Sequence, residues 1–218
     1  FLRRTKPKGS LPPKVRFENW VRLSGEQEEY YKLRYKIRRQ RLKDLVGRNS
    51  ERQVKTSIFG ALSYLLQICN FSPNSKESSK IPEVLELCRT AETNGSKTII
   101  FSRFLEFGIF GVHSKLRQAG HKAGILHGQM SGRERNEALE LFKTSPSQNI
   151  LISTVFTGGV GLNLTEASTI IHFDHWWNPA IVWQAEDRAH RFGQNKQVNV
   201  HSLFSRGTIE ERIFNLLK

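Results

Sequence analysis

The feature that most constrains the fold is a repeated change from helical to extended periodicity after residue 75. Short, continuously apolar stretches alternate with segments whose apolar residues recur every three or four positions. Strands that are apolar along their whole length are buried on both faces, and the helices between them supply the crossovers of a parallel sheet. The sequence therefore predicts an α/β fold with helices on both faces of a parallel sheet. We expect strands at 97–101, 122–126, 149–154, 169–173 and 197–204, and helices at 81–93, 104–119, 133–142, 181–190 and from 209 onwards.

The first 75 residues have a different character. After a proline-containing lead-in, residues 15–23 predict a strand, and two long helices are predicted at 26–46 and 54–69. A turn-forming run at 70–75 closes this part. We therefore expect a lead-in and a basic helical subdomain at 1–75, lying apart from the main sheet, and the sheet domain at 76–218.

The net charge of +14 is concentrated in the first part of the chain. Residues 1–56 hold 17 Lys and Arg against 6 Asp and Glu, whereas residues 57–218 hold 17 against 14. A local excess of this size suits a polyanion, because Lys and Arg release condensed counterions when they neutralise phosphates. A solvated basic helix face explains the same composition equally well, so charge alone leaves both interpretations open.

Other classes of protein fit the composition poorly. No apolar run approaches the length needed to cross a bilayer, so we expect no membrane association. Cys69 and Cys88 are too few for a disulfide framework, and they have no metal-ligand spacing with the histidines. We interpret both as buried apolar residues in a reducing compartment, and we expect no metal ligands in this chain.

Four polar residues near the predicted helix at 181–190 recur at helical spacing. Gln184, Asp187, Arg188 and Arg191 are separated by three or four positions and could share one side of that helix. Two guanidinium groups projected together suit a phosphate, and Asp187 is placed to hold Arg191 in a fixed rotamer. For the spacing alone, a salt-bridged surface helix is the simpler explanation.

Two further segments follow predicted strands. Residues 154–164 carry Gly158, Gly159 and Gly161, whose backbone N–H groups could contact a phosphate, although such clusters are often only turns. Residues 173–179 place Trp176 and Trp177 in a loop before the predicted helix at 181–190. Packing in the core is the usual fate of tryptophan, so neither segment identifies a site by itself.

Taken in order, these segments resemble the second, C-terminal RecA-like (P-loop NTPase-like) lobe of the Swi/Snf-like ATPases, in superfamily two of the helicases. The resemblance covers nearly the whole chain, and Gln184–Gln194, which resembles motif VI, is its most specific part. Phe156, Thr157 and His127 depart from the residues that are usual in the family. The other matching segments are Leu65–Asn70, Ser79–Lys80, Thr98–Ser102 (motif IV), Leu126–Ser131, Thr154–Leu164 (motif V) and Gly207–Glu211.

The resemblance implies a specific division of labour at the nucleotide. ATP and Mg²⁺ would lie between two lobes and be held mainly by the N-terminal RecA-like lobe, because no Gly-x-x-x-x-Gly-Lys-[Ser/Thr] motif occurs here. Arg188 and Arg191 would be arginine fingers that reach the γ-phosphate. Nucleotide-binding or coupling roles would fall to Gln184, Asp187, Gly159, Gly161 and Asn163.

The resemblance also implies a surface that follows the phosphate backbone of double-stranded DNA without reading its bases. The basic part of the first long helix, from Tyr30 to Lys43, would be the second protrusion of the family. The residues expected to contact DNA are Ser102, Arg103, Gly128, Thr154, Trp177, Arg38, Arg39 and Arg41.

The expected function is that of the C-terminal motor lobe of a double-stranded-DNA translocase. The full-length parent would be a DNA-dependent ATPase that remodels nucleosomes or other DNA-bound proteins, as in DNA repair, and this chain alone would be inactive. A DNA-binding or regulatory module without ATP turnover and a strand-separating helicase stay open as alternatives. We expect a nuclear protein in a eukaryote, and otherwise one in the cytoplasm or nucleoid.

Overall fold

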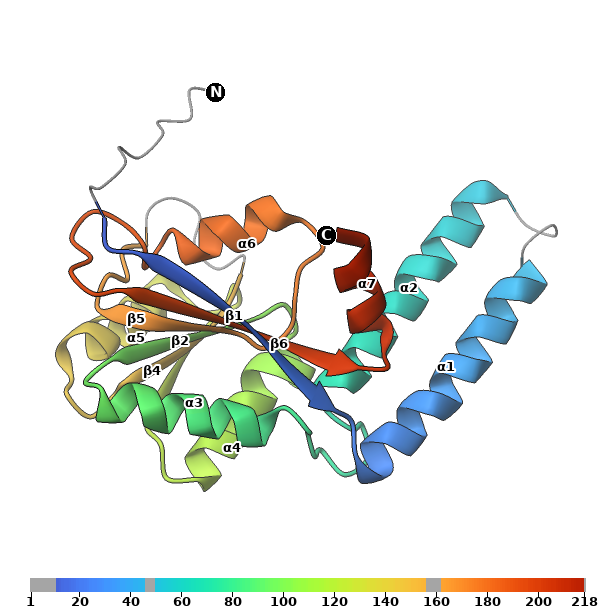
Figure 1. Cartoon of the computed structure of the whole chain (residues 1–218), viewed down its shortest axis with the longest axis horizontal. Helices are drawn as coiled ribbons and strands as arrows, with labels where there is room; N and C mark the ends of the chain where they lie inside the picture. The colour runs from blue at the N-terminus through green and yellow to red at the C-terminus, as the bar shows by residue number, and fades with distance from the viewer. Residues whose placement is uncertain (1–10, 46–49, 156–161, 218) are drawn as a thin grey trace.

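The computed structural model describes residues 11–45, 50–155 and 162–217, and it contains the predicted parallel sheet (Figure 1). The order of the strands in the sheet is β1-β6-β5-β2-β4-β3, and every neighbouring pair is parallel. The carboxyl ends of the strands therefore share one edge. The strands are β1 (Lys14–Arg22), β2 (Lys97–Ser102), β3 (Ala123–Leu126), β4 (Ile150–Thr154), β5 (Ala167–His172) and β6 (Val198–Arg206).

Helices cover both faces of the sheet, as predicted. On one face α3 (Ile81–Thr93) and α4 (Gly111–Gln118) pack against a core that includes Ile100 of β2. On the other, α5 (Gly132–Thr144) and α6 (Pro179–Glu186) pack against a core that includes Ile99. Successive residues of a strand point to opposite faces, so the fully buried Ile99 and Ile100 each serve one core.

The position of β1 corrects one expectation. Residues 14–22 were expected to lie apart from the main sheet, but β1 pairs with β6 from Lys14 opposite Val198 to Arg22 opposite Arg206. As an edge strand β1 is only partly buried, so its apolar pattern is loose and does not show which sheet it joins. The division of the chain at residue 75 otherwise stays a prediction.

Two long helices, α1 (Gly25–Leu45) and α2 (Glu51–Asn70), extend beyond the sheet, and we call this pair the protrusion (Figure 1). Ser50 and Gln53 form a capping box that fixes the start of α2. At the base, Tyr31, Leu65 and neighbouring apolar residues form a cluster separate from the two faces of the sheet. The closing helix α7 (Ile209–Leu217) packs against α2 there.

The helix expected at 104–119 begins with a π-helical turn, η1 (Leu105–Phe110), before α4 continues it. Gly108 permits this, because a Cβ atom at that position would lie 2.1 Å from Oγ of Ser102. The turn thus approaches the end of β2 closely. Within the described residues, no helix is long and apolar enough to cross a membrane.

Candidate functional site

The motif VI segment is less helical than its spacing predicted. α6 ends at Glu186, so Arg188 and Arg191 do not lie on one face of a regular helix, and this expectation is corrected. The backbone tightens there, with Arg188 N donating to Ala185 O at 3.3 Å. The carbonyl of Arg188 accepts from Leu164 N at 2.9 Å, a long-range bond in place of one from the next helical turn. Local spacing does not reveal such a contact.

Arg188 is held at both ends by residues that flank the glycine-rich loop. Besides the bond from Leu164, its Nη2 donates to Val155 O at 3.2 Å. Its side chain is half-buried, and this burial lowers the pKa of the guanidinium, which remains a cation. The expected Gly159 and Gly161, together with Phe156 and Thr157, lie outside the described residues.

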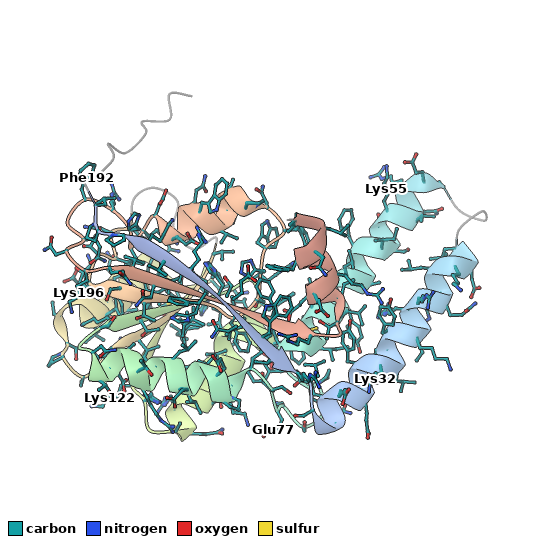
Figure 2. All side chains as sticks on the ribbon, in the orientation of Figure 1. Lys32, Lys55, Glu77, Lys122, Phe192 and Lys196 are labelled. Carbon is teal, nitrogen blue, oxygen red and sulfur yellow. The ribbon has the colours of Figure 1, made fainter. Side chains whose placement is uncertain are left out.

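Arg191 is exposed, and the loop that carries it is held by hydrogen bonds of Gln194, three residues further along the chain. Gly193 has φ +98°, a left-handed conformation that favours glycine. The buried Gln194 donates from Nε2 to Ala167 O at 2.8 Å and to Thr165 O at 3.0 Å. Figure 2 shows the neighbouring Phe192 at the end of the molecule opposite to the protrusion. The loop is therefore a fixed platform that presents Arg191.

The other expected nucleotide residues differ in accessibility. Gln184 and Asn163 are exposed, and Asp187 is half-buried. Nothing in the described chain tests a contact of any of them with a nucleotide, so their roles stay predictions.

A buried carboxylate that the sequence did not single out anchors α6. Glu186 is fully buried and accepts from Lys14 Nζ at 2.9 Å and from Arg16 Nη1 at 2.7 Å, both on β1. Nε2 of His172 lies 3.3 Å from the same carboxylate. Burial alone would raise the pKa of Glu186, but the hydrogen bonds from His172, Arg16 and Lys14 outweigh it and hold the pKa at about 2. The edge strand thereby fixes the helix that leads to Arg188.

A second buried network lies at the carboxyl ends of β2 and β5. The carboxylate of Asp174 accepts from the Ser102 hydroxyl, from Asn70 Nδ2 at 2.8 Å and from Arg103 N at 3.0 Å. Ser102 is fully buried. Its hydroxyl therefore supports Asp174 instead of facing a DNA surface, which corrects that expectation.

Lys80 connects this network to α7. Its ammonium group is fully buried and donates to Glu210 Oε1 at 2.7 Å, to Phe173 O at 2.8 Å and to Asn70 Oδ1 at 3.3 Å. A buried charge is tolerated only when it is paired and hydrogen-bonded, as it is here. The network therefore joins the end of α2, the end of β5 and the start of α7. In the sequence, Lys80 and Glu210 stand out only as members of segments that carry the resemblance, and nothing in the sequence marks Asp174 as a site residue.

Arg103 clamps the tryptophan loop. Its guanidinium carbon lies 4.3 Å from the ring centroids of both Trp176 and Trp177, which stack on each other at 4.8 Å. Burial lowers the pKa of Arg103, although the nearby Asp174 opposes this. The cation is packed against aromatic faces, and its expected contact with DNA stays a prediction. Phe59 of the protrusion approaches Trp177 with its ring centroid at 6.3 Å.

The remaining expected DNA contacts fall into two groups. Thr154 is buried at the end of β4, and Arg38 of α1 is half-buried with its guanidinium 4.7 Å from the ring centroid of Tyr64. Trp177 is half-buried as well, whereas Gly128, Arg39 and Arg41 are exposed, and the contacts of all these residues with DNA stay predictions.

The comparisons with known proteins identify the family of the chain. The model of the family described as "Helicase conserved C-terminal domain" matches residues 79–193. An uncharacterized ATP-dependent helicase of Mycoplasma pneumoniae is 33% identical over 219 residues, which is 98% of this chain and 21% of the relative. The chromatin-remodeling ATPase INO80 of Neurospora crassa is 39% identical over 137 residues, 63% of this chain and 7% of the relative.

Among solved structures, the Sulfolobus solfataricus SWI2/SNF2 ATPase core in complex with dsDNA has a TM-score of 0.80 and 31% identity. The match covers 94% of this chain and 44% of that one. The chain thus spans about a fifth of the length of the helicase relative. It belongs to the helicase conserved C-terminal domain family, within the Swi2/Snf2 ATPases, whose RecA-like C-terminal lobe it forms.

Proposed function

We propose that this chain is the C-terminal motor lobe of an ATP-dependent double-stranded-DNA translocase. The observation that carries the proposal is the arrangement of the two arginines. Arg188 is bonded to both flanks of the glycine-rich loop, and Arg191 is presented by the rigid loop that follows. Two cations held in this way suit a phosphate chain bound on a facing lobe.

The nucleotide would be shared unequally. ATP and Mg²⁺ would be held mainly by the N-terminal lobe, and this chain would add Arg188 and Arg191 as arginine fingers. An exposed guanidinium and a fixed, half-buried one fit a γ-phosphate, because charge spreads over its oxygens during transfer. Gln184, Asp187 and Asn163 would transmit the state of the cleft.

The DNA-facing surface would follow the phosphate backbone. Arg39 and Arg41 of the protrusion are exposed cations, and Gly128 exposes backbone after β3. The Sulfolobus relative was solved with double-stranded DNA, which supports this partner. The INO80 relative is named a chromatin-remodeling ATPase, which supports nucleosomes or other DNA-bound proteins as targets, in the nucleus where the source is eukaryotic.

The test uses the full-length parent protein with Arg188→Ala and Arg191→Ala. We expect each change to lower DNA-stimulated ATP hydrolysis roughly 10³-fold, the scale of an arginine finger, while duplex binding is largely retained. Arg133→Ala is the matched control, because Arg133 is an exposed cation paired at 2.8 Å with Glu137 on α5. Full turnover in both variants would remove the arginine-finger assignment.

The same preparations separate the alternatives. A regulatory module without turnover predicts no hydrolysis by the parent protein at all. A strand-separating helicase predicts ATP-dependent release of a labelled strand from a forked duplex, which a duplex translocase does not require.

A further inference from the structure

A groove with an apolar floor runs along the protrusion, between α1 and α2. It has a volume of about 340 Å³. Leu65 and Ala61 on α2 form its buried floor, and Ile209 at the start of α7 closes its base. Ile58 lies in the groove and is 38% exposed, so apolar surface remains open to solvent there. We call this feature the hairpin groove.

The lining follows helical periodicity on both walls. On α1 the lining residues are Tyr35, Arg38, Arg39, Leu42 and Lys43, and on α2 they are Ile58, Ala61, Leu62 and Leu65. Positions separated by three, four and seven residues form one face of a helix. Two helices therefore turn matching stripes toward the groove, over a length of about 12 Å for eight residue steps. In a helical bundle, a third helix packs into a groove of this kind between two helices.

The rim of the groove is strongly positive. Arg39 and Lys43 are exposed on the α1 side, and the half-buried Arg38 also lines the groove. Residues 32–45 carry seven Lys and Arg against the single acid Asp44. An occupant of this groove must therefore offer carboxylates to the rim and apolar side chains to the floor.

We propose that the hairpin groove is a docking site for an acidic amphipathic helix of a partner protein. Duplex DNA would neutralise the positive charges of the rim, but it has no apolar side chain to cover the floor. DNA binding therefore does not explain the exposed apolar surface of Ile58 in the groove. Because Arg39 also belongs to the proposed DNA-facing surface, the helix competes with DNA for this rim. The proposal itself does not depend on ATP turnover.

The experiment measures binding of a designed peptide to the 218-residue chain by fluorescence anisotropy. The probe is a labelled helix-forming peptide of about four turns, roughly 14 residues, with leucines on one face and glutamates on the other. A scrambled peptide of identical composition has the same charge without the apolar face. We expect the patterned peptide to bind at least about tenfold more tightly than the scrambled one.

Two matched pairs of variants locate the site. Ile58→Ser removes groove surface, whereas Phe59→Ser removes an apolar side chain that is 57% exposed, faces Trp177 and does not line the groove. Arg39→Gln removes a charge from the rim, whereas Arg41→Gln removes an exposed charge of the protrusion that does not line the groove. We expect Ile58→Ser to weaken binding of the peptide roughly fivefold and Arg39→Gln to weaken it roughly threefold. The control variants Phe59→Ser and Arg41→Gln should change peptide binding little.

Duplex DNA binding provides the comparison for the charge variants. Arg39→Gln and Arg41→Gln should weaken a non-specific duplex about equally, because both remove one phosphate contact. Equal binding of the scrambled peptide would overturn the proposal and show a surface that recognises charge only. Equal effects of Ile58→Ser and Phe59→Ser on the peptide would overturn it as well, and thermal unfolding of each variant shows that the fold is retained.

Discussion

Glu186 offers the sharpest test of how the edge strand supports the motif VI segment. Its carboxylate is fully buried and is bonded to Lys14 and Arg16 of the edge strand β1 and to His172 of the interior strand β5. Glu186→Gln keeps the shape of the side chain and removes only its charge. The variant leaves these basic groups around a neutral amide, so the folded state should lose electrostatic stabilisation.

The magnitude follows from the pKa of the carboxyl. Its ordinary pKa is 4.5. In the folded chain burial raises the pKa of this carboxyl, but the hydrogen bonds from His172, Arg16 and Lys14 outweigh burial and hold the pKa at about 2. The gap corresponds to about 3 kcal/mol of unfolding free energy at neutral pH. The Arg16 side chain is 45% exposed and is partly screened by water, so we expect a loss of about 2 kcal/mol in Glu186→Gln.

The contribution of the Glu186 carboxylate to the unfolding free energy depends on pH in a defined direction. Because the folded pKa is depressed, the contribution of the carboxylate is complete above the unfolded pKa of 4.5 and is lost as pH falls toward about 2. Urea unfolding followed by tryptophan fluorescence, at a series of pH values from 7 downwards, measures the difference between wild type and variant. We expect this difference to be constant near neutrality and to shrink below a pH of about 4.5.

Glu86→Gln is the control for this series, since Glu86 lies on α3 in an exposed pair with Arg89 at 3.9 Å. It should change the unfolding free energy by less than about 0.5 kcal/mol. A difference for Glu186→Gln that persists unchanged to low pH would refute the electrostatic explanation and leave packing as the cause.

Two further predictions concern the protein interior. Lys80→Met should lower the unfolding free energy by about 3 kcal/mol, because it leaves Glu210 buried without its cation, and adding Glu210→Gln should recover part of the loss in the same urea assay. A double variant no more stable than Lys80→Met would contradict this pairing. Burial raises the pKa of the Cys88 thiol to about 12 and raises that of Cys69 as well, so neither should react with a thiol reagent at mildly alkaline pH until the chain unfolds. Rapid labelling of the native protein would show that one of the thiols is accessible.

The sequence was sufficient for the sheet wherever burial is complete. The strand segments 97–101 and 149–154 are apolar on both faces, and both became central strands that helices cover. β1 could not be assigned in this way, because an edge strand is half-exposed and its partner β6 lies more than 170 residues away in the chain. Its membership of the sheet depends on pairing that no local pattern records.

The candidate site was predictable in its residue types more than in its contacts. The spacing of Arg188 and Arg191 suggested one helical face, but the long-range bond from Leu164 takes the carbonyl that would extend the helix. Ser102 and Arg103 stand at a strand end, as expected, yet the Ser102 hydroxyl donates to Asp174 and the Arg103 guanidinium packs against the tryptophan rings. Such partners meet only in the folded chain. The residue types therefore indicated where the site lies, whereas the contacts of each side chain became visible only in the structure.

The contacts also connect the two proposed working surfaces, which lie at opposite ends of the molecule. From the protrusion, Asn70 of α2 bonds to Asp174, and Asp174 accepts from Ser102 at the end of β2. Ser102 is paired with Thr154 of the adjacent strand β4. The next residue, Val155, accepts from Arg188.

The bonds that Asp174 accepts from Asn70 and Ser102 are buried, the step from Ser102 to Thr154 is a strand pair, and the bond from Arg188 to Val155 is part-buried. A tilt of α2 against the sheet would therefore have to break the Asn70–Asp174 bond before it could reach the arginine loop. Breaking a buried bond costs about 1–3 kcal/mol, so within this lobe the protrusion and the arginine loop are expected to move as one rigid body. Coupling between DNA and nucleotide would then arise from the position of the whole lobe relative to its partner lobe, with little internal flexing.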